Sequence, residues 1–204
     1  MGYSQAQKAE SRQRVLENAS RQIREHGIEA LGVADCMRSA GLTHGAFYGH
    51  FASRDALIVE ALEYALTQSK ARVAALSTDG NKRSQTPLQS IAEAFLDESH
   101  VRNPGSGCAL CALAGEARHA GPNVRALLTR YLHEFTARIA QATSSGDEKA
   151  ALGIVATIVG AITLARAVDD DELAKSILSS SLALVMAQDG AARQEGSRAT
   201  AFPA

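Results

Sequence analysis

Apolar side chains recur every three or four residues along most of the chain, and no segment shows the strict alternation of a half-buried strand. Residues 8–26 give a clear case, because Val15, Ala19 and Ile23 fall on one face of a helix. Gly27 comes next, and glycine is common just past the end of a helix. The pattern predicts a first helix over residues 8–26 with one buried stripe.

Two short helices are expected next, over residues 33–40 and 44–50, and the turn between them contains Gly41. Glycine adopts the left-handed conformation that lets two helices cross sharply. This order is the helix-turn-helix pattern. Phe47 and Phe51 are four residues apart, so they share one face of the second helix, which we assign to the core. The apolar residues that can pack this pair of helices against the first are Val33, Met37, Leu42, Phe47 and Phe51.

Capping residues and chain breakers mark the later helices. Ser53 can cap a long helix from Arg54 to about Leu76, and Thr86 followed by Pro87 starts another helix after a polar loop. The remaining expected helices begin near Cys108 and after Gly121, and cover residues 149–168 and 170–188. With about nine helices and no strand, the predicted fold class is all-α.

Composition and charge indicate how the chain is divided into domains. Of the 204 residues, 46% are hydrophobic and 21% charged, which is typical of a folded domain with a core. The net charge is −1, so any surface for nucleic acid must be local. Residues 1–54 carry a net +2 and residues 55–204 a net −3. We expect a helix-turn-helix DNA-binding domain over residues 1–54, a helical regulatory and dimerisation domain over 55–188 and a flexible tail over 189–204.

Several features bear on location. The first residues are polar and lack the apolar stretch of a signal peptide. An odd number of cysteines, 3, favours a reducing cytosol over a disulfide framework. The longest uncharged run, residues 150–165, is shorter than the ~20 residues that cross a bilayer and contains Thr157 and Thr163. We therefore expect a buried helix there and a cytoplasmic protein.

An ordered series of motifs runs through residues 12–57. Residues 40–43 are Ala-Gly-Leu-Thr, residues 47–51 are Phe-Tyr-Gly-His-Phe and residues 53–57 are Ser-Arg-Asp-Ala-Leu. This series resembles the DNA-binding domain of the TetR family of bacterial helix-turn-helix transcriptional repressors. The rest of the chain is similar to the family only in length and helical layout. The resemblance implies a non-enzymatic repressor that binds a palindromic DNA operator, and we expect no cofactor.

The resemblance also implies roles for single residues. Thr43 would cap the second helix, whose free N–H groups suit a phosphate. His44 and Arg54 both stand where many family members have lysine, and Gly32 stands where a Ser or Thr cap is common. For Arg38, phosphate contact and mere exposure to solvent stay equally open. The implied phosphate contacts are Thr43, Tyr48, His50 and Arg54, and the implied base contacts are His44, Gly45 and Ala46.

The last two helices are the expected dimer interface, because family members pair through them. Here these helices cover residues 149–188, and small residues such as Gly153 and Gly160 permit close helix approach. A helix that is apolar all round must be covered on every side, which a four-helix interface between two copies would do. Burial of the same helix inside one monomer is the alternative.

Cys108 and Cys111 form a C-x-x-C pair at an expected helix start, where a thiol becomes more reactive. Three interpretations of this pair are open. The cysteines can pack in the core, they can sense an electrophile or oxidant, or they can form a zinc site completed by His100 and His119. We expect no metal, because no second C-x-x-C exists. A helical thiol-redox enzyme that uses this pair is the alternative function, although the chain lacks a thioredoxin-like βαβ pattern.

A pocket for a small-molecule inducer is implied by the resemblance, within residues 87–166. Aromatic and polar residues stand out there against an aliphatic background. The candidate ligand-binding residues are Phe95, His100, Tyr131, Phe135 and Arg138. Each of these residue types is more often used in ordinary packing or at the surface.

Overall fold

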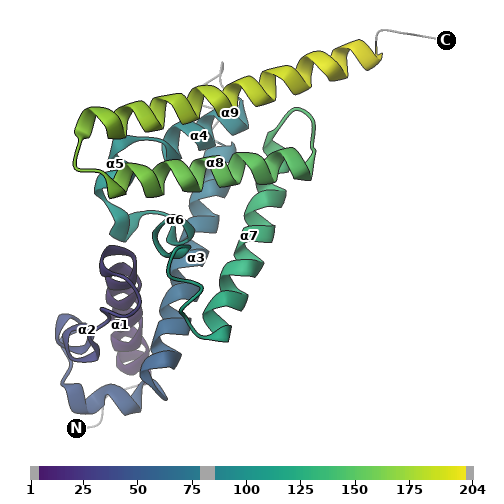
Figure 1. The fold of residues 1–204 in the computed structure, drawn as a ribbon. Helices are drawn as coiled ribbons and strands as arrows, with labels where there is room; N and C mark the ends of the chain where they lie inside the picture. Colours follow the sequence, from purple (N-terminus) through teal and green to yellow (C-terminus); the bar gives the residue numbers. More distant parts are fainter. Residues whose placement is uncertain (1–4, 79–85, 201–204) are drawn as a thin grey trace. The chain divides into compact units, whose positions relative to one another are not determined.

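The computed structural model describes residues 5–78 and 86–200, with side chains to residue 190. Most of those residues are helical, and none of them forms a strand. The predicted all-α class is confirmed (Figure 1). The helices are α1 (Gln5–His26), α2 (Val33–Ser39), η1 (His44–Gly49), α3 (Arg54–Thr78), α4 (Pro87–Phe95), α5 (Glu98–Arg102), η2 (Pro104–Ser106), α6 (Ala109–Leu113), α7 (Pro122–Ala142), α8 (Glu148–Ala167) and α9 (Asp171–Thr200). The short elements α5 and η2 were not expected, and η1 is a 3-10 helix rather than an α-helix.

Packing divides the chain into two compact units. Unit 1 holds residues 1–69 and 103–129, and unit 2 holds residues 70–102 and 130–204. Unit 1 therefore contains the helix-turn-helix segment together with η2 and α6. This division follows packing, whereas the boundary that we expect at residue 54 concerns function and stays a prediction.

The expected stripe of α1 forms the centre of unit 1. Val15, Ala19 and Ile23 are all completely buried, as predicted. Gly27 ends the helix with φ +90°, a conformation that favours glycine. The carboxylate of Glu116 accepts a hydrogen bond of 2.9 Å from the backbone N–H of Ile28, and a Cβ on Gly27 would lie 2.6 Å from that carboxylate. The end of α1 thus requires a glycine for two reasons.

A buried arginine ties α1 to the segment around η2. Arg24 is only 7% exposed, and its Nη1 donates to the carbonyl of Gly107 at 3.0 Å. Its Nε donates to the carbonyl of Ser20 at 2.9 Å, and its Nη2 to the side chain of Gln68 at 3.3 Å. Because a buried guanidinium must have its donors satisfied, these bonds fix residues 103–107 against α1.

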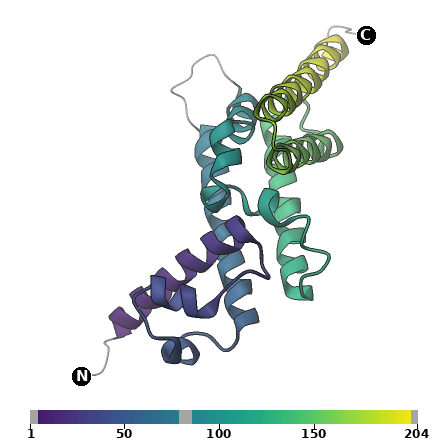
Figure 2. The ribbon, with the colours of Figure 1, turned by 60° about the vertical axis from the view of Figure 1, so that its left-hand side comes forward.

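In unit 2, α8 and α9 run side by side, as Figures 1 and 2 both show. The buried face of α8 includes Ile154, Ile158 and Ile162, while α9 contributes Leu178 and Val185. α4 packs against both helices. The helix α9 continues to Thr200, through residues that we expected to form a tail, and residues 201–204 lie outside the described part of the chain.

The apolar helix α8 is covered on one side only. Among the described residues it is the one helix long and apolar enough to cross a membrane, and 39% of its most apolar window is buried. Helices of soluble cores pass the same test, so this is weak evidence for a membrane. The expectation of a helix buried within the chain holds for one face, while Leu152 and Leu164 remain 48% and 58% exposed.

Candidate nucleic-acid interface

The aromatic pair of the helix-turn-helix is buried. Phe47 and Phe51 are each 3% exposed, and their rings stack with centroids 5.8 Å apart. Met37 of α2 is completely buried, and the guanidinium of Arg12 lies 4.7 Å from the centre of the Phe51 ring. The assignment of both phenylalanines to the core is confirmed. Val33 and Leu42, which we also expected there, are only half-buried.

The turn is built around Gly41, as expected. Its φ is +75°, and its N–H donates to the carbonyl of Arg38 at 3.0 Å. The N–H of Leu42 donates to the carbonyl of Met37 at 2.9 Å, which closes the end of α2. A side chain at position 41 would meet no atom within 4 Å, so the backbone conformation alone calls for glycine here.

Thr43 occupies the cap position of η1 without capping through its side chain. Its backbone is extended (φ −78°, ψ 151°), and its carbonyl accepts from the N–H of Ala46 at 3.1 Å. In the described part of the chain its side chain makes no cap hydrogen bond, so the expected capping role is wrong. The tight first turn of a 3-10 helix, bonded from residue i+3 to i, replaces the side-chain cap. The Thr43 hydroxyl instead stays exposed.

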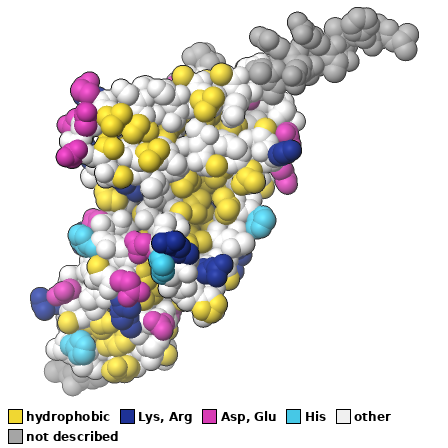
Figure 3. All heavy atoms as spheres, viewed as in Figure 1, with side chains coloured by type: hydrophobic (Ala, Val, Ile, Leu, Met, Phe, Trp, Pro, Cys, Tyr) yellow, Lys and Arg dark blue, Asp and Glu magenta, His cyan; other side chains and the backbone are white. Residues whose placement is uncertain are grey.

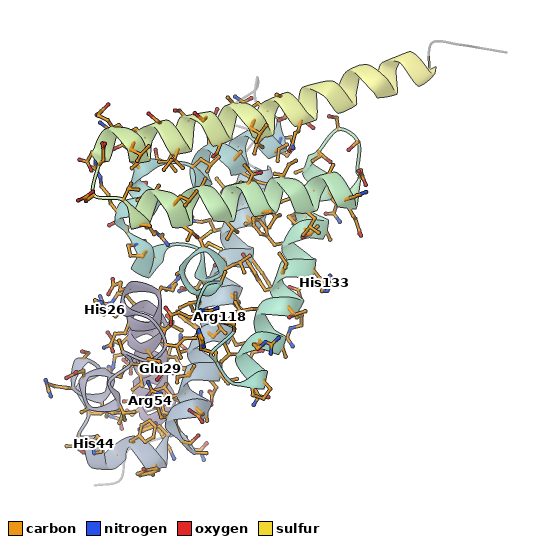
Figure 4. The ribbon with its side chains drawn as sticks, viewed as in Figure 1. His26, Glu29, His44, Arg54, Arg118 and His133 are labelled. Atoms are coloured by element: carbon orange, nitrogen blue, oxygen red, sulfur yellow. The ribbon has the colours of Figure 1, made fainter. Side chains whose placement is uncertain are left out.

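The start of η1 and one face of it are open to solvent. His44, which Figure 4 labels, and Gly45 are exposed. Ala46 is half-buried and Tyr48 is 77% exposed. The Tyr48 ring packs edge-on against Phe47 at 5.2 Å, which orients the phenol away from the core. The polar groups of η1 therefore face solvent, while the buried ring of Phe47 anchors the helix to the core.

His50 lies half-buried at the end of η1. Its carbonyl accepts from Nε of Arg12 at 3.3 Å. Its Nδ1 is buried and has no hydrogen-bond partner among the residues that the structure describes. Burial lowers the pKa of His50 below its ordinary value of 6.5, and the charges of Lys8 and Arg12 lower it further. Nδ1 of His50 can therefore still donate or accept a hydrogen bond, because no described protein group uses it.

Arg54 points at the backbone of unit 1. Its Nη2 donates to the carbonyls of Ile28 and Glu29, both at 2.9 Å, and its Nε donates to the carbonyl of Leu31 at 3.3 Å (Figure 4). These bonds hold the loop between α1 and α2, so the structure gives Arg54 a positioning role that we did not expect. Phosphate contact by the same side chain stays a prediction. Ser53 caps α3 as predicted, because its Oγ accepts from the N–H of Ala56 at 3.0 Å.

The sequence interpretation missed Arg12 and Lys8 of α1. Arg12 forms an ion pair with Glu60 of α3, in addition to its contacts with Phe51 and the carbonyl of His50. Lys8 faces the same part of η1. The two lie on the polar side of an amphipathic helix, which we examined only for its apolar stripe. The candidate Arg38 is exposed and pairs with Asp35 at 3.1 Å.

In unit 2, four of the five candidate ligand residues form one buried row. Phe95 lies edge-on to His100 at 5.2 Å and stacks on Phe135 at 5.4 Å, and Phe135 stacks on Tyr131 at 5.9 Å. None of these four side chains is more than 6% exposed. We call them the aromatic row. Arg138, the fifth candidate, is exposed.

A small cavity adjoins one end of the aromatic row. It measures about 140 Å³ and is lined by Lys70, Val73, Tyr131, Glu134, Phe135 and Arg138. Lys70 and Glu134 form an ion pair in its wall. An apolar cavity of about 150 Å³ holds a benzene molecule in another protein, so this one has room for a small ring.

His100 closes the other end of the aromatic row and stays neutral. Its Nδ1 lies 2.8 Å from the carbonyl of Phe95, and because a carbonyl only accepts, Nδ1 carries the proton. Burial lowers the pKa of His100 to about 4, helped by the charges of Arg166 and Arg72 and opposed by the bond to Phe95. Arg166 donates to the carbonyl of His100 at 2.7 Å and so fixes α5 against α8.

Cys108 and Cys111 are buried thiols, 3% and 4% exposed, in unit 1. Cys108 occupies the cap position of α6, which is only five residues long (Ala109–Leu113). Within residues 5–78 and 86–190, no three His, Cys, Asp or Glu side chains gather closely enough to hold a metal ion. Burial is what core packing requires, and it keeps both sulfurs from direct contact with solvent.

The fold and the exposed face of η1 define a helix-turn-helix protein of the transcription-regulator class. Residues 15–61 match the family model described as "Bacterial regulatory proteins, tetR family". This match supports a TetR-family regulator, and the fold is shared with solved structures of TetR-family regulators. DNA binding, dimer formation and response to ligands are typical of that family.

Several solved structures share this fold. The reduced form of NemR from E. coli is 20% identical, with a TM-score of 0.71, over 86% of this chain and 94% of that chain. A TetR transcriptional regulator from Chloroflexus aurantiacus is 23% identical, with a TM-score of 0.73, over 88% and 94%. SCO4454, a TetR-family regulator from Streptomyces coelicolor, is 25% identical, with a TM-score of 0.65, over 89% and 97%. No curated protein matches the sequence.

Proposed function

We propose that the protein is a transcriptional repressor that binds a palindromic DNA operator as a homodimer. The observation that carries the proposal is the outward set of polar groups on η1, where Tyr48 is 77% exposed between two buried phenylalanines. A helix anchored by its apolar side can enter the major groove with its start against the base edges. Residues 1–54 then form the DNA-binding domain and residues 55–188 the regulatory domain. The function is non-enzymatic and cytoplasmic.

Within this proposal the residues of η1 divide into two sets. His44, Gly45 and Ala46 at the exposed start of the helix read base edges, since a helix start is the part that reaches them. Thr43, Tyr48 and His50 contact phosphates, which position the protein without reading the sequence. Arg38 and Arg54 are further phosphate contacts. Arg54 also holds the loop between α1 and α2 in place through its bonds to backbone carbonyls.

A second copy of the chain is the proposed partner of α8 and α9. Leu152 and Leu164 of α8 and Leu173 and Leu184 of α9 are between 47% and 58% exposed. Hydrophobic side chains gather over these two helices in Figure 3. Large exposed apolar residues on two adjacent helices are typical of a protein–protein interface. A four-helix interface through residues 149–188 would cover them.

A small molecule that binds beside the aromatic row is the proposed inducer. The row offers flat apolar faces, and the cavity next to it adds the charged groups Lys70, Glu134 and Arg138. This chemistry suits a compact ring with a polar substituent. Thiol modification of Cys108 or Cys111 is the second candidate trigger, and their burial means that it requires a local opening.

The decisive experiment is selection of bound DNA from random duplexes, followed by comparison of the full palindrome with its half-site. Tighter binding to the full site, lost as salt rises, supports a dimeric operator-binding protein. Equal binding to the half-site contradicts it. His44→Ala should change the preferred base at one position per half-site, while uniform weakening would remove His44 from base reading. Turnover of a thiol substrate by wild type but not by Cys108→Ser would favour the thiol-redox alternative.

A further inference from the structure

The cavity beside the aromatic row combines an apolar side with an unequal set of charges. It lies within unit 2, between the C-terminal part of α3 and one face of α7. Val73, Tyr131 and Phe135 are no more than 3% exposed and form its apolar side. Two cationic side chains and one carboxylate line the rest, namely Lys70, Arg138 and Glu134. The cavity therefore has one positive charge in excess.

Arg138 is the charge that remains available to a ligand. Glu134 precedes it by four residues on α7, a spacing that favours an ion pair between the two side chains. Glu134 instead pairs with Lys70 of α3. Within the described part of the chain the guanidinium of Arg138 is left without an ion pair, and this side chain is exposed. A guanidinium presents a planar fork of donors that matches the two oxygens of a carboxylate.

The volume of the cavity limits the ligand to one ring. At about 140 Å³ it is close to the roughly 150 Å³ that holds benzene in another protein. Tyr131 and Phe135 stack on each other with centroids 5.9 Å apart, and the ring of a ligand can pack against either of them. A charged substituent on that ring would lose its water at the apolar side without gaining a partner. It therefore belongs at the polar side, beside Arg138.

We propose that this cavity binds a single-ring aromatic carboxylate, with the ring against Tyr131 and Phe135 and the carboxylate on the guanidinium of Arg138. The inference rests on the proposed inducer site and adds the chemical class of the inducer. Lys70 is a positioning residue, because its ion pair with Glu134 keeps that carboxylate away from Arg138. The excess positive charge disfavours an organic cation, and the volume disfavours a two-ring acid.

Matched ligands test the chemical class. We would titrate the full chain with benzoate and follow the NMR signals of the ligand, with benzamide as a neutral molecule of nearly the same shape. Benzoate should bind about tenfold more tightly than benzamide, because hydrogen bonds between two charged groups are among the strongest. Naphthoate, which has two rings, should bind more weakly than benzoate. Benzoate that binds no more tightly than benzamide, or not at all, would overturn the inference.

A pair of arginine variants tests where the carboxylate lies. Arg138→Gln should weaken benzoate about tenfold and leave benzamide unchanged. Arg125→Gln removes another exposed arginine of α7 that does not line the cavity, so it should bind both ligands as wild type does. Thermal unfolding of both variants would show that they remain folded. Wild-type affinity for benzoate in Arg138→Gln would contradict the assigned contact.

The role of Lys70 requires a double variant. Lys70→Gln frees Glu134 to pair with Arg138, so the affinity for benzoate should fall severalfold. Lys70→Gln combined with Glu134→Gln removes the competing carboxylate as well, and the affinity should return to the wild-type range. If the ion pair only held α3 and α7 together, the double variant would bind as weakly as Lys70→Gln.

These titrations use no DNA, so they can fail independently of the proposed function. If wild type binds no duplex DNA, the proposed function fails while benzoate binding is still measured. If wild type binds DNA but prefers benzoate no more than benzamide, the function stands and the inference falls. Where both bind, benzoate should weaken the affinity for the selected operator in wild type and not in Arg138→Gln. An operator affinity that benzoate leaves unchanged would show that this cavity is not the inducer site.

Discussion

Phe47 and Phe51 of unit 1 pack inward and leave the intervening Tyr48 at 77% exposure, whereas Phe95, Phe135 and Tyr131 of unit 2 are all buried in one row. Unit 1 thus uses aromatic side chains to hold polar groups outward. Unit 2 uses them to build an apolar interior beside a cavity. The exposed polar groups of unit 1 suit contact with a hydrated, charged partner such as DNA. The apolar interior of unit 2 suits a small molecule that is buried when it binds. The following predictions test this contrast.

The largest effect is expected from Phe47→Ala in unit 1. Removing a buried ring leaves a cavity, which destabilises a protein by about 3–5 kcal/mol. Because η1 loses its anchor, DNA binding should disappear together with stability. Urea unfolding and DNA affinity would be measured side by side, with Tyr48→Ala as the exposed neighbour. A Phe47→Ala protein as stable as wild type would refute the buried role of this ring.

In unit 2, His100 should make stability depend on pH. Its pKa is about 4 in the folded chain and near its ordinary 6.5 when unfolded, so the unfolded chain takes up a proton first as pH falls. Stability should decrease between these two values, by about 2 kcal/mol at pH ~5 and about 3 kcal/mol at pH ~4. Above pH ~7 this group should have no effect.

Urea unfolding of wild type and His100→Gln at neutral and mildly acidic pH would measure this loss. His119→Gln, which changes an exposed histidine, is the control and should follow wild type. Identical pH dependence in wild type and His100→Gln would mean that His100 does not cause this loss of stability.

Arg54→Ala separates the two roles of this side chain. Loss of its bonds to three backbone carbonyls should lower the free energy of unfolding by about 1–3 kcal/mol. Arg38→Ala is the control, since an exposed ion pair contributes about 0–1 kcal/mol. If Arg54→Ala keeps its stability but binds DNA more weakly, Arg54 acts only as a phosphate contact, which is the role that the sequence alone favoured.

The smallest effect is expected from Tyr48→Phe. Removing one exposed hydroxyl should leave stability within about 0.5 kcal/mol. If the phenol donates to a phosphate, the affinity for every DNA sequence should fall by a similar factor, equivalent to about 0.5–1.5 kcal/mol. Competition binding with several duplexes would measure the factor. A change in sequence preference would instead place Tyr48 among the residues that read bases.

Local rules were enough to predict several features of unit 1. The stripe of α1, the left-handed Gly41 and the burial of Phe47 and Phe51 all follow from spacing within a few residues. The bonds of Arg54 and Arg12 were not predictable, because they join residues far apart in the sequence that only the tertiary fold brings together. The 3-10 form of η1 was missed for a related reason: a helix this short has few bonds of its own, and its surroundings decide its geometry.

In unit 2 the sequence singled out aromatic residues that lie together in the structure, but not how they are arranged. Phe95, Tyr131 and Phe135 stood out against an aliphatic background, yet the background cannot say which of them touch. Their stacking distances depend on how α4 and α7 pack, which is a tertiary property. Whether the cavity beside them binds an inducer remains a proposal.

The links from Arg24 to Gly107 and from Ile28 to Glu116 have a practical consequence for truncation. A fragment that ends at residue 54 lacks both acceptors, although it contains the whole helix-turn-helix. It would expose the guanidinium of Arg24 to water and leave the end of α1 without its carboxylate. Because water replaces the lost partners, each lost bond lowers the free energy of unfolding by about 0.5–1.5 kcal/mol. A minimal DNA-binding fragment should therefore carry residues 103–129 as well, joined by a linker or added as a separate peptide.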